Sequence, residues 1–295
     1  MSRFTRNAGF AALAAALALT GCAKQDTQAA ADTTAKAAPT PPAAAAAPNV
    51  VTFTAKEYAF DGPDSIPAGL TTIHLNSAGK ELHHVQLIKF GDGKTYADFQ
   101  GAMKAMASGP PPAWIIPYGG VNPPPPGGTT EAMQVLEPGN YAVVCYVEDA
   151  KHVPHIMKGM MRPLTVTASP NANMTEPNAD VTLTLNDYTF TLSKPLAAGK
   201  QMIKVENAAA QPHEVVLVQL APGKTIADLG AWIMDMKGPP PGKPIGGVPG
   251  FMKGKNSFFE ATLEPGDYGM ICFVPDAKDG KPHFTHGMTS QFKVS

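Results

Sequence analysis

Residues 136–147, LEPGNYAVVCYV, recur at residues 263–274 as LEPGDYGMICFV. Each stretch is a short run rich in apolar and β-branched residues behind a Pro-Gly turn, a pattern typical of a β-strand. Because side chains alternate along a strand, Tyr141, Val143 and Cys145 are expected to share one face and to point inward. The sequence therefore predicts, twice, a buried strand that ends in a cysteine.

The repeat extends over most of the chain. VTFTAKEYAF, from residue 51, returns from residue 181 as VTLTLNDYTF, and GKTYADFQGAMKAM, from residue 93, returns from residue 223 as GKTIADLGAWIMDM. Self-similarity of this kind indicates a duplicated structural unit. Short strand-like runs between turn residues favour the all-β class, and we expect two tandem β-sandwich domains at 49–168 and 180–295, joined by a linker at 169–179.

Each copy also contains one segment of good helix formers. Residues 96–107 and 226–237 are predicted to be short helices, and each is followed at once by GPPP, which a helix cannot continue through. The proline-rich segments 109–128 and 238–250 are expected to run as extended connections on the surface.

The N-terminus is typical of an export signal. Arg3 and Arg6 precede an apolar run over residues 8–19 that is too short to span a membrane as a mature helix, which predicts a signal peptide at residues 1–21. LTGC, ending at Cys22, resembles the lipobox of bacterial lipoproteins, and this resemblance implies that Cys22 becomes the mature N-terminus and carries a lipid. Residues 22–48, rich in Ala, Thr and Pro, are predicted to be a disordered tether. We expect an exported, membrane-anchored lipoprotein, periplasmic or on the cell surface; an ordinary secretory signal with an incidental Cys22 is the alternative.

Composition excludes one class of partner. The formal net charge is −1 with 16% charged residues, so the chain offers no basic surface for nucleic acid. Its 295 residues suit two domains. Cys145 and Cys272 occupy equivalent positions in the two copies, and we expect both to be free thiols that a metal would protect in an oxidising compartment.

The duplication provides a test for a site, because residues that serve a duplicated site should recur at matching positions. Half of the eight histidines fail this test, but four pairs of residues pass it: His83 with His213, Cys145 with Cys272, His155 with His283, and Met160 with Met288. Two imidazoles and a thiolate, with a weak thioether on the axis, form the blue-copper geometry. We therefore predict one copper ion in each domain, two in total. His152, Met157 and His286 do not recur and are the candidate substitutes for a predicted ligand.

These residues resemble the cupredoxin (type 1 copper) family over essentially all of residues 49–295. NAAAQPHEVVLV is similar to the plastocyanin-like strand that carries the first His, and EPGDYGMIC to the strand that ends in the Cys. The resemblance implies Greek-key sandwiches that hold copper for electron transfer. The loops between Cys and the second His, residues 146–154 and 273–282, are longer than in small electron carriers and are similar to those of copper nitrite reductases.

That similarity raises the question of catalysis. The reductases place a His immediately before the Cys as a ligand of their catalytic copper, whereas this chain has Val144 and Ile271 there. The chain also lacks the His-x-His pairs that multicopper oxidases use to reduce oxygen. We expect no enzymatic activity.

Three functional hypotheses remain. The first is an envelope electron carrier with two type 1 copper sites that exchanges electrons with redox partner proteins. The second is copper buffering or delivery without electron transfer, and the third is a metal-free interaction module. The sequence leaves the oligomeric state open.

Overall fold

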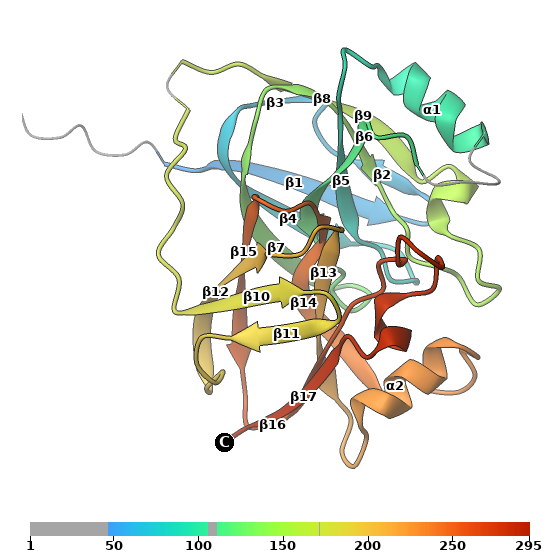
Figure 1. Cartoon of the computed structure of the whole chain (residues 1–295), viewed down its shortest axis with the longest axis vertical. Helices are drawn as coiled ribbons and strands as arrows, with labels where there is room; N and C mark the ends of the chain where they lie inside the picture. The colour runs from blue at the N-terminus through green and yellow to red at the C-terminus, as the bar shows by residue number, and fades with distance from the viewer. Residues whose placement is uncertain (1–46, 106–110, 171) are drawn as a thin grey trace, which may run out of the picture. The chain divides into compact units, whose positions relative to one another are not determined.

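The computed structural model describes residues 47–105, 111–170 and 172–295 (Figure 1). The predicted signal peptide and nearly all of the predicted tether, Cys22 included, lie outside the described residues. In the part of the chain that is described, no helix is both long enough and apolar enough to cross a membrane.

The first copy of the repeat folds into β-strands with one α-helix and one 3₁₀ turn. Its elements are β1 (Asn49–Lys56), β2 (Ala59–Asp61), β3 (Ser65–Pro67), β4 (Gly69–Ser77), β5 (Val85–Phe90), α1 (Tyr96–Ala105), β6 (Ile115–Val121), β7 (Thr129–Leu136), β8 (Gly139–Val144), η2 (His155–Lys158) and β9 (Met161–Thr167).

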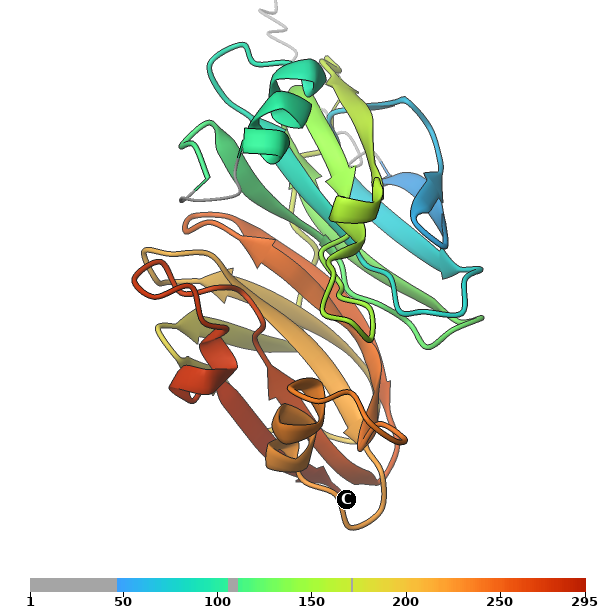
Figure 2. The same ribbon diagram turned by 90° about the vertical axis from the view of Figure 1, so that its right-hand side faces the viewer.

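The second copy repeats this order without a counterpart of β3, and α2 follows β13 as α1 follows β5 (Figure 2). Its elements are β10 (Val181–Asn186), β11 (Thr189–Leu192), β12 (Gly199–Asn207), β13 (His213–Leu220), α2 (Ile226–Ile233), β14 (Gly242–Phe251), β15 (Asn256–Leu263), β16 (Gly266–Ile271), η3 (His283–His286) and β17 (Thr289–Val294). The all-β class and the tandem β-sandwiches are confirmed.

The strands form two sheets that both copies share. One sheet has the order β11-β10-β12-β15-β7-β4-β1-β2 and the other the order β17-β16-β13-β14-β6-β5-β8-β9-β3. Within each copy the chain crosses repeatedly between the sheets, as a Greek-key sandwich requires. The copies join where β15 pairs with β7 and where Phe251 of β14 pairs with Tyr118 of β6. The sequence did not predict this continuity. The bounds of the two domains, 49–168 and 180–295, and of the linker between them stay a prediction.

The proline-rich segments are more ordered than predicted. β6 and β14 lie inside them, and most of residues 117–124 are buried rather than on the surface. Pro117 and Pro244 stand beside register shifts in the ladders with β5 and β13, where a missing N–H is tolerated. Gly120 and Gly247 follow with positive φ, and a Cβ on either would overlap the carbonyl oxygen of a neighbouring strand.

The two helices begin where predicted, and the second is shorter. Thr95 and Asp98 form reciprocal hydrogen bonds at the start of α1, and Thr225 and Asp228 repeat them at the start of α2. Helix α2 ends at Ile233 rather than at residue 237, because the chain then turns through the positive φ of Met236. The predicted last residues of α1 lie outside the described residues.

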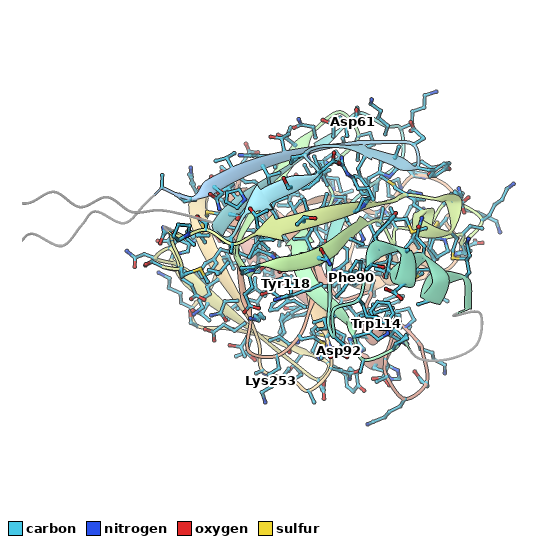
Figure 3. All side chains as sticks on the ribbon, turned by 90° about the horizontal axis from the view of Figure 1, so that it is seen from above. Asp61, Phe90, Asp92, Trp114, Tyr118 and Lys253 are labelled. Carbon is cyan, nitrogen blue, oxygen red and sulfur yellow. The ribbon has the colours of Figure 1, made fainter. Side chains whose placement is uncertain are left out.

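The strand that ends in a cysteine has two buried faces. Tyr141, Val143 and Cys145 join the core between the sheets, as the period of two predicts, while Ala142 and Val144 face a second cluster under α1. Phe90 and Trp114 belong to that second cluster, close to α1 (Figure 3). A strand covered on both faces is held firmly, so the cysteine that follows it has a fixed position.

Candidate metal centres

Three segments that are distant in sequence deliver the first set of candidate ligands. His83 lies two residues before β5, Cys145 directly follows β8, and His155 begins η2. The loop from Cys145 to Met160 folds back on itself: the Cys145 amide donates to the Met160 carbonyl (3.2 Å), and the Ile156 amide donates to the Cys145 carbonyl (2.8 Å). These backbone bonds hold the cysteine and the second histidine side by side without help from a metal.

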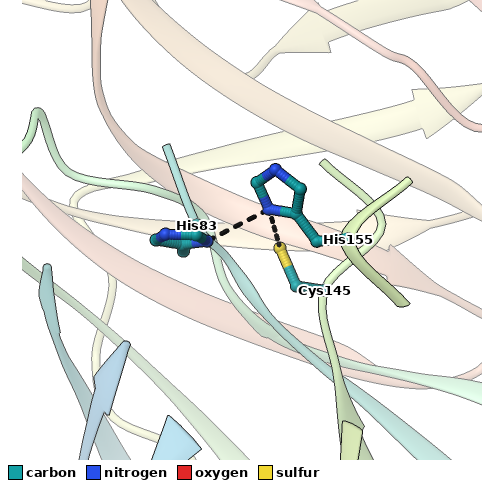
Figure 4. Close-up of side chains that lie close together, drawn as sticks. All are labelled: His83, Cys145 and His155. Carbon is teal, nitrogen blue, oxygen red and sulfur yellow. Dashed lines mark hydrogen bonds between the residues drawn. The ribbon is translucent and has the colours of Figure 1, made fainter. Parts of the chain in front are cut away.

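The three side chains of the first centre converge on one small volume (Figure 4). Nδ1 of His83 is 3.1 Å from Nδ1 of His155, and Sγ of Cys145 is 3.5 Å from the same Nδ1. All three residues are 0% exposed. Protein, rather than water, therefore surrounds the point that these atoms face.

The second copy repeats the arrangement. Its ligand-bearing atoms from His213, Cys272 and His283 lie within 4.8 Å of one another, as do those of the first centre. Sγ of Cys272 is 3.4 Å from Nδ1 of His283, and the two histidine rings are 4.5 Å apart between centroids. The Cys272 amide donates to the carbonyl of Met288 (3.3 Å), the same backbone contact as in the first copy.

These separations fit a single metal ion. Bonds of about 2.0 Å to imidazole nitrogen and about 2.3 Å to thiolate sulfur, at angles near those of a trigonal site, place the ligand atoms about 3.1–3.7 Å apart. The distances measured in the two copies, 3.1, 3.5 and 3.4 Å, fall in that range. All ligand atoms of a set lie within 4.8 Å of one another, so each set is arranged to hold a single ion.

A buried nitrogen without a partner marks the second centre. Nδ1 of His213 is inaccessible to solvent and has no hydrogen-bond partner among the described residues. The other ring nitrogen, Nε2, is 2.8 Å from Oδ1 of Asp187. Because the carboxylate accepts a hydrogen bond from Nε2–H, the lone pair of Nδ1 is left to bind a metal.

A carboxylate also lies near the second histidine of each set. Nε2 of His155 is 2.8 Å from Oε2 of Glu81, and Nε2 of His283 is 3.7 Å from Oδ2 of Asp276. Neither Nε2 has a hydrogen-bond partner of good geometry among the described residues, so these contacts are electrostatic. The contact at His155 leaves its Nδ1 facing Cys145 and His83.

Burial leaves the candidate histidines, but not the cysteines, in the protonation state that binds a metal. Burial, followed by the neighbouring imidazole, lowers the pKa of His83 to about 4 and that of His283 to about 4, so both are neutral donors at pH 7. Burial raises the pKa of the Cys145 thiol to about 12 and raises the pKa of Cys272 as well. A cation at the centre would reverse the effect on the thiols, because a coordinated thiol is deprotonated.

The predicted axial residues and the candidate substitutes occupy different surroundings. Met160 and Met288 are 0% exposed, and their amides donate to the carbonyls of His155 and His283. Met157 is 63% exposed, and His152 pairs with Glu148 on the surface.

A third cluster is found in the second copy alone. His286 faces Asp279 and, with Asp276, forms an additional group that could hold a cation. It is largely exposed and has no counterpart in the first copy.

One pair of buried residues was missed by the sequence analysis. His84 and Glu214, which follow the first histidine of each set, are 8% and 5% exposed. Nε2 of His84 accepts from the amide of Tyr146 (2.9 Å), and Oε1 of Glu214 accepts from the amide of Phe273 (2.8 Å). Each side chain thus secures the residue after the cysteine. Because the two differ in type, the test of recurrence passed over them.

Comparisons with known proteins gave structural likenesses only. No protein-family model and no curated protein matches the chain. Reduced auracyanin from Roseiflexus castenholzii is 22% identical over 42% of this chain and 100% of its own, with a TM-score of 0.28. Auracyanin A from Chloroflexus aurantiacus, a blue copper protein, is 24% identical over 41% of this chain and 100% of its own (TM-score 0.28). A blue copper oxidase from Nitrosomonas europaea is 15% identical over 84% and 86% (TM-score 0.25).

The strand order and the positions of the three candidate ligands in it indicate the fold. In each copy a histidine precedes or begins one strand of a two-sheet sandwich, and a cysteine follows the neighbouring strand of the same sheet. Each copy has a cupredoxin-like fold. The cupredoxin-like copies carry their His, Cys and His at the same end of that strand pair, and the loop after the cysteine returns the second histidine.

Proposed function

We propose that this protein is a copper-binding electron carrier with two type 1 copper centres, one in each cupredoxin-like copy. The observation that carries the proposal is the convergence, in both copies, of two neutral imidazoles and a buried thiol at separations that fit one ion. Two nitrogens and one sulfur are the equatorial set of blue-copper sites. Bound copper would supply one-electron exchange between its two oxidation states.

The chain's own residues hold the ligands in place. The amides of Cys145 and Cys272 are tied to the carbonyls of Met160 and Met288, so the geometry is set by the backbone before any ion is bound. A fixed ligand set suits electron transfer, because neither oxidation state forces the protein to rearrange. Met160 and Met288 are the proposed axial ligands, which would tune the potential.

The proposal is tested by loading the full chain with Cu(II). We expect two copper ions per chain, an intense visible thiolate-to-copper band and a narrow copper hyperfine pattern in paramagnetic resonance. The control is the double variant Cys145→Ser, Cys272→Ser, in which both signals should vanish because serine supplies no thiolate. A wild-type protein that stays colourless with two coppers bound would exclude type 1 centres.

We propose an electron carrier rather than an enzyme. The residues before the two cysteines, Val144 and Ile271, are apolar and 0% exposed, so they offer no ligand for a second, substrate-binding copper. Redox partner proteins at the envelope are the proposed partners.

Burial of the ligands favours one alternative, copper buffering or delivery. His155 and His283 are 0% exposed, and an ion beneath such a cover exchanges slowly. Competitive Cu(I) titration and cyclic voltammetry separate the two functions. A reversible one-electron wave for each centre supports electron transfer, whereas tight Cu(I) binding without a reversible wave supports buffering.

We propose further that a lipid on Cys22 anchors the protein in the cell envelope. LTGC, with its preceding apolar run, supports this. In membrane fractionation of the producing bacterium, the wild-type chain should sediment with membranes, and Cys22→Ser should be released or left unprocessed. A wild-type chain that is wholly soluble would contradict the anchor.

A further inference from the structure

One tyrosine in each copy stands in a tight turn that favours a smaller residue. Two residues join β1 to β2, and two join β10 to β11; the second of them is Tyr58 in the first copy and Tyr188 in the second. Their φ angles are 59° and 60°. Short turns favour Gly or Asn at such an angle, because a bulky side chain is strained there. A tyrosine found twice at this position therefore has a reason outside the turn.

Both tyrosine rings lie against the second histidine of their centre. The ring centroids of Tyr58 and His155 are 5.1 Å apart, with an angle of 63° between the ring planes. Those of Tyr188 and His283 are 5.5 Å apart, with an angle of 67°. The two histidines are 0% exposed, whereas both tyrosines are partly buried. Each tyrosine is thus part of the cover between a candidate ligand and solvent.

The tyrosine hydroxyl groups tie the turns to the loop that follows each cysteine. In the second copy the Tyr188 hydroxyl donates to Oδ2 of Asp276 (2.5 Å). In the first copy Nζ of Lys158 donates to the Tyr58 hydroxyl (2.7 Å) and also to Asp149. Asp149 and Asp276 occupy the same position after the cysteine of their copy. Turn and loop are therefore fastened to each other in both copies, directly in one and through a lysine in the other.

A further side chain packs on each tyrosine ring. Nζ of Lys158 lies 4.1 Å from the ring centroid of Tyr58. His286 occupies the matching position in the second copy, and its ring centroid is 5.1 Å from that of Tyr188. The tyrosine ring thus has a partner at the same sequence position in both copies, although the residue type differs. Contacts that recur with different residue types indicate that the position of the ring is what the two copies share.

We propose that Tyr58 and Tyr188 are lids that hold the second histidine of each centre in place and control the passage of copper ions and other small solutes between solvent and the ligands. The inference rests on the proposed function, since passage of copper needs a copper centre. For an ion to pass on this side, the ring has to move away from the histidine, so the contacts of the ring and the hydroxyl slow uptake and release. Both tyrosines act through the histidine and are positioning residues.

The first test needs no copper, because each buried thiol lies directly beside the histidine that the lid covers. In the metal-free full chain, alkylation by iodoacetamide is followed separately for the peptides that contain Cys145 and Cys272. Tyr58→Ala should raise the rate at Cys145 about tenfold or more and leave the rate at Cys272 within about threefold of the wild type. Tyr188→Ala should do the reverse. The second thiol of the same molecule is the internal control for a general loosening of the fold.

Two further variants sharpen this test. Tyr58→Phe keeps the ring and removes the hydroxyl, so its alkylation rate at Cys145 should fall between those of the wild type and Tyr58→Ala. Tyr96→Ala is the matched control: Tyr96 is also partly buried, but it lies on α1 against Phe99. Both thiols should keep their wild-type rates in this variant. Equal acceleration at the two thiols in Tyr58→Ala, or no acceleration at Cys145, would overturn the lid.

The second test follows the release of copper. The Cu(II)-loaded full chain is mixed with excess EDTA, and the loss of the thiolate-to-copper band is recorded over time. In Tyr58→Ala, about half of the band should disappear about tenfold or more faster than in the wild type, while the other half keeps its wild-type rate. A missing band in the wild type contradicts the proposed function itself. An intact band, with unchanged alkylation rates in Tyr58→Ala and Tyr188→Ala, contradicts the lids alone.

Discussion

The two copies match in the atoms that face the proposed ions and differ in the charges around them. Both present His, Cys and His at nearly the same separations. Yet the residue that secures the amide after the cysteine is a neutral imidazole, His84, in the first copy and a buried carboxyl, Glu214, in the second. Geometry at a metal centre is constrained by the ion, whereas a residue one contact away can change charge while keeping its hydrogen bond.

The orienting carboxylates differ in the same way. In the first copy the short contact is made to the second histidine, by Glu81 to His155, and in the second copy it is made to the first histidine, by Asp187 to His213. Each copy thus makes its shortest carboxylate contact on a different side of its centre. We expect the two centres to differ in potential although their ligands are the same.

The largest expected effect is on the stability of the metal-free protein. Burial raises the pKa of Glu214 from 4.5 to about 7, so its contribution is fully present below pH 4.5 and is lost as pH rises through 7. At about 1.4 kcal/mol for each tenfold change in proton affinity, the loss is about 3 kcal/mol. Urea unfolding of Glu214→Gln should therefore match the wild type near pH 4.5 and exceed its free energy of unfolding by about that amount at pH 8.

His84 provides the control with the opposite sign. Its folded pKa of about 3 is below the ordinary 6.5, so its contribution is present above pH 6.5 and is lost as pH falls toward 3. His84→Gln should remove part of the acid destabilisation and leave the alkaline limb unchanged. The rest of the acid destabilisation comes from the buried histidines of the two centres. Equal pH profiles for Glu214→Gln and His84→Gln would break the contrast between the copies.

The sequence was sufficient for the fold class, the repeat and the two convergent sets of His, Cys and His, because recurrence filtered eight histidines down to four. The same test passed over His84 and Glu214. They occupy equivalent positions and each accepts a hydrogen bond from the amide after its cysteine, but they differ in residue type. Sequence patterns also missed β6 and β14, since Pro117 and Pro244 favour loops unless a register shift accommodates them. Sheets that continue across the copies depend on pairings between distant residues, which no local pattern encodes.

A smaller effect is expected on the potentials of the two centres, each observed alone. Cys145→Ser leaves only the second centre, beside Glu214, and Cys272→Ser leaves only the first, beside His84. Burial is the main cause of the raised pKa of Cys272, and the charge of Glu214 adds to it. Ionised Glu214 therefore disfavours added negative charge near Cys272 and stabilises the oxidised ion. Voltammetry of Cys145→Ser should show a potential that falls between pH 5 and 9 by on the order of 60 mV, the equivalent of a tenfold change in a one-electron equilibrium.

The potential of Cys272→Ser should not change over this range, because His84 is neutral throughout it. Adding Glu214→Gln to Cys145→Ser should abolish this dependence of the potential on pH. If the dependence persists, another group causes it, and the charge of Glu214 is not the reason why the two centres differ.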